Sequence, residues 1–182
     1  MSSARPARWR AGFLLSASLG VCCAVWPSLA PAADFDDDYD VKVWEEIEAK
    51  LPAPPKDSSL IAFFVSASSA NRFQVDGDSI SVGADGVIRY TLVVTSASGV
   101  RNVSYEGIRC ETAERRLYAF GRADGAWSKA RGNMWVKIQN SSLNRQHAAL
   151  FTEYFCPIGN PVADADEARK ALLAGGHPSV PH

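Results

Sequence analysis

The feature that most constrains the fold is a series of glycine-containing turn signals within residues 60–138. Four dipeptides place a small polar residue before a glycine: Asp76-Gly77, Asp85-Gly86, Ser98-Gly99 and Asp124-Gly125. Such pairs favour the positive φ angles that tight hairpin turns require. The segments between them are short and rich in β-branched and aromatic residues, which predicts about six consecutive strands in an antiparallel meander.

The segment 87–95 has the alternation of a strand with two different faces. One face carries Ile88, Tyr90, Leu92 and Val94, and the other carries Arg89, Thr91 and Thr95. Successive side chains of a strand point to opposite sides of the sheet, so the segment predicts one apolar and one polar face.

Two other segments carry strand signals of a different kind. Residues 60–65 (LIAFFV) form a continuous apolar run, which predicts a strand that is buried on both faces or lies at the centre of the sheet. Gly107 interrupts a long strand-like segment, and a glycine in that position indicates a candidate β-bulge.

Helical spacing occurs before the strands. Val43, Ile47 and Leu51 recur at steps of four residues, which predicts a short helix over residues 43–51. Pro52, the first of three closely spaced prolines, would end this helix, because proline lacks a donor N–H and restricts the residue before it.

A longer amphipathic helix is predicted after the strands. Its apolar face consists of Leu143, His147, Leu150, Phe151, Tyr154 and Phe155, whose spacing gives about three turns. Ser141 or Ser142 would cap this helix, and Pro157 follows its end. His147 is expected to be a core or boundary histidine. The helix supplies the apolar cover that one face of the sheet needs, so we predict an α+β fold with this helix packed on one face of the meander.

We divide the whole chain into four parts on the basis of composition and residue spacing. Residues 1–32 form a leader, residues 33–41 an acidic disordered lead-in, residues 42–157 the α+β domain and residues 158–182 a C-terminal tail. Within the tail, residues 164–174 predict a short helix, with Asp164 or Asp166 as its cap and Gly175 as its stop. Its apolar face is mostly alanine, so we expect it to pack weakly.

The leader has the pattern of a bacterial export signal. Arg5, Arg8 and Arg10 precede an apolar stretch at residues 11–26, and Ala30-Pro31-Ala32 supplies a small-x-small cleavage pattern. The apolar stretch is too short and too poorly flanked for a transmembrane helix. We therefore expect a periplasmic protein whose mature form has no transmembrane segment.

Lipid attachment at Cys22 is the alternative route of processing. The run Leu19-Gly20-Val21-Cys22 places valine where this modification expects a small residue. In that case Cys22 would become the acylated first residue of an outer-membrane lipoprotein, and the acidic segment would be its tether.

The charge of the mature chain argues against general nucleic-acid binding. Three of the 19 basic side chains leave with the leader, which leaves 16 against 20 acidic side chains and a net charge of −4. Five of these acids lie within residues 33–41, so the rest of the chain is nearly neutral and lacks the excess of cations that nucleic acid attracts.

Cys110 and Cys156 are the only cysteines that remain after removal of the leader. In an oxidising compartment two such cysteines usually pair, so we predict a disulfide that pins the last amphipathic helix to the sheet. The alternatives are a redox-active pair, which lacks the Cys-x-x-Cys spacing, and two unpaired thiols.

Catalytic and metal-binding patterns are scarce. The sequence contains no Gly-x-Ser-x-Gly run, no His-x-x-x-His pair and no complete calcium loop, so we expect no metal and no cofactor. A carboxylate pair formed in the fold remains the alternative, with Glu106 as one candidate member.

The strongest candidate for a binding surface combines arginine with aromatic side chains. Its members are Tyr105, Arg109, Tyr118, Arg122 and Trp127. Guanidinium groups match the oxygens of carboxylates and phosphates, so such a surface can hold an anionic or glycan ligand. The alternative is a solvated outer face of the sheet whose cations deter aggregation.

Several runs of the chain resemble one protein family. These are Trp44-Glu45 with Leu51-Pro52, residues 78–90 (DSISVGADGVIRY), residues 105–110 (YEGIRC) and Tyr154-Phe155-Cys156. They are similar to the cryptic neisserial protein (CNP)-like family, a set of uncharacterised exported proteins of Gram-negative bacteria. The resemblance covers residues 43–157 and implies a single domain in the cell envelope. The family has no established catalytic residues, so it leaves the activity open.

We therefore expect a non-catalytic binding or accessory module of the periplasm or cell envelope. Its partner would be an envelope protein or an anionic or glycan ligand. The alternatives are a periplasmic hydrolase with a carboxylate-based site and a structural lipoprotein tethered through Cys22.

Overall fold

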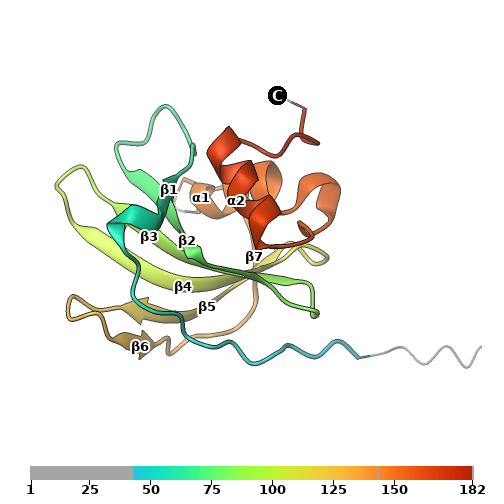
Figure 1. Ribbon diagram of the computed structural model, residues 1–182, viewed down its shortest axis with the longest axis horizontal. Helices are drawn as coiled ribbons and strands as arrows, with labels where there is room; N and C mark the ends of the chain where they lie inside the picture. Colours follow the sequence, from blue (N-terminus) through green and yellow to red (C-terminus); the bar gives the residue numbers. More distant parts are fainter. Residues whose placement is uncertain (1–42, 143, 182) are drawn as a thin grey trace, which may run out of the picture. The chain divides into compact units, whose positions relative to one another are not determined.

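A computed structural model of the chain describes residues 43–142 and 144–181 (Figure 1). The leader with Cys22, the acidic lead-in and Leu143 lie outside the described residues, so the predictions made for them stay predictions.

An open antiparallel sheet with its strands in sequence order forms the centre of the fold, as predicted. The strands are β1 (Leu60–Ala62), β2 (Arg72–Val82), β3 (Val87–Thr95), β4 (Arg101–Arg109), β5 (Glu114–Gly121) and β6 (Trp127–Lys129), and the short β7 (Val136–Lys137) also pairs with β5. Gly86, Gly99 and Gly125 have φ of +74°, +85° and +81°. Three of the four predicted turns are therefore confirmed, because glycine tolerates these angles at little cost.

The fourth turn signal, Asp76-Gly77, was a wrong prediction, because it lies inside β2. The pairing of β2 with β3 shifts between Asp76 and Ser81, which is the irregularity of a β-bulge. A Cβ on Gly77 would lie 3.1 Å from Ile61 Cδ1 and 3.4 Å from the backbone oxygen of Ser59. Gly77 therefore lets the neighbouring segment at Ser59 and Ile61 pack closely against β2, and it does not form a chain-reversing turn.

Residues 60–65 also differ from expectation. Only Leu60–Ala62 form a strand, and this strand lies at the edge of the sheet. Phe63 is buried and still bonds to Phe73 through its backbone N–H, but the Phe64 side chain is 67% exposed. The apolar run does not continue as a strand, because the chain turns away from β2 after this last backbone bond.

The helices lie together on one face of the sheet (Figure 1). They are α1 (Arg145–Ala149), which continues directly into the π-helix η2 (Leu150–Phe155), and α2 (Ala165–Ala174); single 3-10 turns occur at η1 (Asp57–Ser59) and η3 (Pro157–Gly159). The predicted amphipathic helix therefore exists, although its second half is wound as a π-helix. Its cap differs, because Asn144 precedes α1 and no side chain caps it.

The core lies between the helices and the sheet. Tyr90 and Leu92 of β3 meet Leu150 and Phe155 of η2, and the rings of Tyr90 and Phe155 lie 5.2 Å apart. Cys110 and Cys156 form the predicted disulfide, with their Cα atoms 5.5 Å apart. The bond joins the end of η2 to the chain just after β4.

The last helix also contributes to this core. Asp164 accepts a hydrogen bond from the Glu167 N–H at 2.8 Å, and Gly175 ends the helix with φ of +80°, which confirms the predicted cap and stop. Ala168 and Leu172 are buried in the core cluster. The prediction that this alanine-rich helix packs weakly was therefore wrong, because its small side chains let it approach β1 and β2 closely.

Residues 43–51 are not helical, and this prediction was wrong. Residues 43–56 contain no helix or strand and run along the face of the sheet that the helices leave open (Figure 1). Val43, Ile47 and Leu51, which suggested a helix face, are all exposed. Their spacing is therefore incidental, and contacts with the sheet override the local helical preference.

Candidate functional site

Residues 43–56, which we call the strap, are fixed to the sheet by hydrogen bonds near both ends. The indole N–H of Trp44 donates to the backbone oxygen of Asp85 at 2.8 Å. Toward the other end, the indole N–H of Trp127 donates to the backbone oxygen of Pro52, also at 2.8 Å. The strap therefore crosses the side of the sheet opposite to the helices, which we call the strap face.

The carboxylate of Glu46 is the centre of the strap's contacts. The Tyr118 hydroxyl donates to its Oε1 at 2.6 Å, and the Trp135 indole N–H donates to its Oε2 at 3.0 Å. Arg116 forms an ion pair and hydrogen bond with the same Oε2, and Arg89 lies 3.7 Å from Oε1. Three hydrogen-bond donors and the nearby Arg89 guanidinium therefore surround one carboxylate, and we call these four side chains the carboxylate receptor.

A glycine in the middle of the sheet makes room for this receptor. Arg89 of β3, Gly107 of β4 and Arg116 of β5 lie opposite one another in one row across the sheet. A Cβ on Gly107 would lie 2.6 Å from the Tyr118 hydroxyl oxygen. The predicted bulge is near this position, because the β4–β5 register shifts between Tyr105 and Glu106. Because Gly107 has no side chain, the Tyr118 side chain can occupy the space between Arg89 and Arg116.

A buried ion pair between Arg89 and Asp85 holds one arginine of the receptor in place. Arg89 binds both carboxylate oxygens of Asp85, at 2.6 and 3.2 Å, and these side chains are 6% and 1% exposed. The same residues hold the strap backbone, since Arg89 donates to the oxygen of Ile47 at 2.7 Å and Asp85 accepts from its N–H at 2.8 Å. Burial opposes ionisation of Asp85, but these bonds outweigh it and hold its pKa below the usual range.

The predicted aromatic residues form one cluster beside the receptor. The ring of Tyr105 lies 5.5 Å from that of Tyr118 and 6.1 Å from that of Trp127. Burial raises the pKa of Tyr118 far above its usual value, and the hydrogen bond to Glu46 adds to this shift. Tyr118 therefore acts as a neutral donor to the carboxylate.

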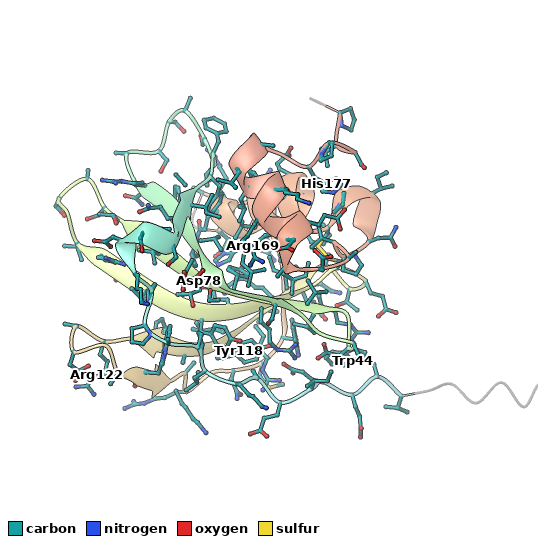
Figure 2. The ribbon with its side chains drawn as sticks, viewed as in Figure 1. Trp44, Asp78, Tyr118, Arg122, Arg169 and His177 are labelled. Atoms are coloured by element: carbon teal, nitrogen blue, oxygen red, sulfur yellow. A yellow bond between two sulfur atoms is a disulfide. The ribbon has the colours of Figure 1, made fainter. Side chains whose placement is uncertain are left out.

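The two predicted arginines lie in different places. Arg109 stacks on Trp44, with its guanidinium carbon 3.9 Å from the ring centroid, and also binds Glu111. Arg122 is exposed, and its nearest acid is Asp124 at 3.9 Å. Figure 2 shows Trp44 and Arg122 at opposite ends of the strap face, with Tyr118 between them. The structure thus brings Tyr105, Tyr118 and Trp127 together, places Arg109 at the strap and leaves Arg122 apart.

Part of the receptor stays open to solvent. A groove of about 290 Å³ runs between the strap and β5–β6, and its lining includes Glu46, Glu48, Arg116, Tyr118, Lys129 and Asn133. Lys129 and Asn133 are exposed at its rim. A chain carrying acidic or amide groups can therefore reach Arg116 and Tyr118 beside the strap.

Sequence reasoning missed most of the receptor. It assigned Glu46 to a helix and Asp85 to a turn, and it gave Arg89 only a place on a polar face. The hydrogen-bond donors and the Glu46 carboxylate are separated by 70 to 89 residues, so no local spacing connects them. The signals that remain in the sequence are an arginine and a glycine inside strand-like segments.

Glu106 lies on the other side of the sheet from the strap. It binds His147 Nε2 at 2.8 Å, accepts from the Ser104 hydroxyl at 2.6 Å and accepts from the Tyr90 hydroxyl at 3.3 Å. Both Glu106 and His147 are 4% exposed, so His147 is the predicted core histidine. The partner of Glu106 is an imidazole and not the second carboxylate of a hydrolase site.

In residues 43–142 and 144–181, no group of three or more His, Cys, Asp or Glu side chains is placed to hold a metal ion. No helix in this part of the chain is long and apolar enough to cross a membrane.

Comparison with known proteins gives one match. Neither the curated proteins nor the solved structures contain a match to this chain. The model of the CNP1-like family matches residues 39–173, a span that includes the strap, every strand and nearly all of α2. The chain belongs to the CNP1-like family.

Proposed function

We propose that this protein is an exported, non-catalytic binding module of the cell envelope, and that its strap face recognises a carboxylate carried on an extended chain. The observation that carries the proposal is the convergence of Arg89, Arg116, Tyr118 and Trp135 on one carboxylate. Charged and aromatic donors in fixed positions favour a planar anion. Glu46 occupies the receptor from within the same chain.

The strap is held in a way that allows exchange. Its contacts with the sheet are mainly hydrogen bonds, ion pairs and the ring contacts of Trp44, and its aliphatic side chains Val43, Ile47 and Leu51 face solvent. Apart from the Trp44 ring, little apolar area is therefore exposed when the strap lifts from the sheet. Its covalent attachment still gives it an effective concentration of roughly millimolar, so a free ligand competes only when it binds more tightly or when the strap is loosened.

The predicted leader supports the location in the envelope. A disulfide between Cys110 and Cys156 fits an oxidising compartment. Mass spectrometry of the mature protein tests this part of the proposal. A chain that begins at Ala33 fits a free periplasmic protein, whereas an acylated chain that begins at Cys22 would make it a tethered lipoprotein.

Binding of a peptide with the sequence of residues 43–56 tests the receptor. The host is the protein purified after expression with its own leader and carrying Trp44→Ala with Glu46→Ala, which removes two attachments of its own strap. We expect this host to bind the peptide, measured by isothermal titration calorimetry. The unaltered protein should bind at least about tenfold more weakly, because its own strap occupies the site.

Two matched controls keep the test specific. A peptide with Gln in place of Glu46 should lose most of the affinity, and adding Arg116→Gln to the host should do the same. Adding Arg101→Gln, which affects an exposed pair with Asp57 away from the receptor, should change nothing. Equal binding of the Glu and Gln peptides would refute the carboxylate receptor. Glu46→Gln alone, which keeps Trp44 and the backbone bonds of the strap, is a second host if the double variant does not fold.

A further inference from the structure

A second hollow lies on the helix side of the sheet and is independent of the strap. It has a volume of about 440 Å³ and lies between the β1–β2 connection and the start of α1, which is within the usual range for small-molecule sites of roughly 300–1,000 Å³. Its lining consists of Val65, Ser66, Ser68, Ser69, Ala70, Asn71, Phe73, Val94, Ser142, Arg145 and Gln146.

Arg145 is the only charged residue in this lining. Its guanidinium donates to the hydroxyl of Ser66 at 2.9 Å and to that of Ser68 at 3.4 Å. Among the described residues, no carboxylate lies within ion-pair distance of it. A guanidinium that has only neutral hydroxyl partners keeps an unbalanced positive charge, and an anion from solution can balance it.

The rest of the lining has two kinds of surface. Four serine hydroxyls and the Asn71 amide supply both donors and acceptors, which suit a ligand that carries several hydroxyl groups. Phe73, Val65 and Val94 form an apolar part, against which the carbon-rich face of a sugar ring can pack. A single cation matches one negative charge better than two.

From these features we infer that the hollow binds a singly charged sugar acid, a hexuronate, through Arg145. The carboxylate pairs with the guanidinium, and the ring hydroxyls bond to Ser68, Ser69 and Asn71. The ring lies against Phe73.

A neighbouring hollow explains why the anion enters this one. It has a volume of about 540 Å³ and shares Val65, Ser66 and Arg145, but its lining also includes Glu153. The carboxylate of Glu153 opposes an anion on that side. The contact between Arg145 and Ser66 therefore separates a hollow without acidic residues from one that contains an acid.

Titration with three probes tests the inference. Sodium glucuronate, glucose and inorganic phosphate are titrated into the purified protein, and binding is followed by isothermal titration calorimetry and by NMR shifts of the serine amides. We expect glucuronate to bind saturably in the millimolar range. Glucose should bind at least about tenfold more weakly, because it lacks the charge-assisted bond.

Two variants identify the residue responsible. Arg145→Gln should weaken glucuronate binding by at least about tenfold, whereas Arg131→Gln, on an exposed segment between β6 and β7, should leave it unchanged. Arg145→Lys keeps the charge and should retain part of the affinity, so it controls for loss of folding. Unchanged binding by Arg145→Gln, or no glucuronate binding at millimolar concentration, would overturn the inference. If phosphate bound as tightly as glucuronate, the hollow would be a site for anions in general and not for a sugar acid.

Discussion

The two faces of the sheet are built from the same strands by different chemistry. On the helix face, Tyr90 and Leu92 of β3 are buried among aromatic and aliphatic side chains. On the strap face, Arg89, which directly precedes Tyr90 on the same strand, is buried against Asp85 and the strap backbone. The first face excludes water by apolar contact, whereas the second is closed by a short extended segment and polar bonds. A single strand can therefore serve a conventional core and a polar recognition surface at once.

Residues 105–110 show how closely the two faces are joined. Tyr105 belongs to the aromatic cluster of the strap face, and Glu106 binds His147 on the helix face. Gly107 leaves room for Tyr118, and Cys110 forms the disulfide that holds the helices. This run lies within the span that the family model matches, and each of these residues has its own structural role.

The largest expected effect tests how much the polar contacts of the strap face contribute to the free energy of unfolding. Asp85→Ala leaves the guanidinium of Arg89 buried without its carboxylate, which should cost about 3–5 kcal/mol. This loss would equal that of a large core truncation and would show that the strap face contributes to global stability. Urea denaturation measures it. A loss below about 1 kcal/mol would mean that Arg89 finds water when its partner is removed.

The disulfide tests the helix face. Cys110→Ser with Cys156→Ser removes a link that spans 46 residues and should lower the free energy of unfolding by about 2–4 kcal/mol. The peptide-binding receptor lies on the other face, so binding measured well below the unfolding temperature should persist. Loss of binding in a folded double variant would show that the two faces are coupled.

Gly107→Ala tests the space between the two arginines. The new Cβ would meet the Tyr118 hydroxyl at 2.6 Å and Val87 Cγ1 at 3.0 Å, so we expect a cost of about 1–3 kcal/mol. Tyr118 should turn away from Glu46, which would loosen the strap and quench or shift tryptophan fluorescence. Gly132→Ala, at an open position where an added Cβ meets no atom within 4 Å, is the matched control.

A pH series compares one buried carboxylate of the helix face with the rest of the molecule. Burial opposes ionisation of Glu106, but His147, Ser104 and Arg115 outweigh it and hold its pKa below the usual 4.5. The unfolded chain therefore takes up a proton first as the pH falls. The stability that Glu106 contributes is complete above its unfolded pKa and is lost as the pH falls through the folded pKa.

Glu106→Gln should flatten this acid dependence. The variant should also be less stable near neutral pH, because His147 loses a charged partner. Denaturant midpoints between pH 3 and pH 7 measure both effects, and Tyr90, whose hydroxyl faces Glu106, stays neutral over this range. An unchanged slope would assign the acid sensitivity to other carboxylates, Asp85 among them.

The smallest effect is expected for Arg122→Gln. Its side chain is mostly exposed and its nearest acid lies at 3.9 Å, so the free energy of unfolding should change by less than about 0.5 kcal/mol. A larger change in the free energy of unfolding would indicate that Arg122 in the β5–β6 hairpin belongs to the polar network of the strap face.

The sequence predicted the elements whose signals are local. The alternation in 87–95, three of four glycine turns, the cap at Asp164 and the cysteine pair all depend on nearby residues or on compartment rules. The strap was missed because its helix-like spacing is local, whereas the hydrogen bonds of Trp44 and Glu46 reach residues 41 to 89 positions away. The edge position of β1 was missed for a related reason, since an apolar run does not say which strands lie beside it.

The distance along the chain between the strap and its receptor has a consequence for the order of folding. Trp44 leaves the synthetic machinery before any strand, but Trp135, whose ring centroid lies 5.9 Å from that of Trp44 in the folded protein, comes after β6. Contacts between such distant residues form slowly, because a long loop must close first. We therefore expect the first described segment of the chain to be the last to find its place, and the fluorescence of this tryptophan pair should report when it does.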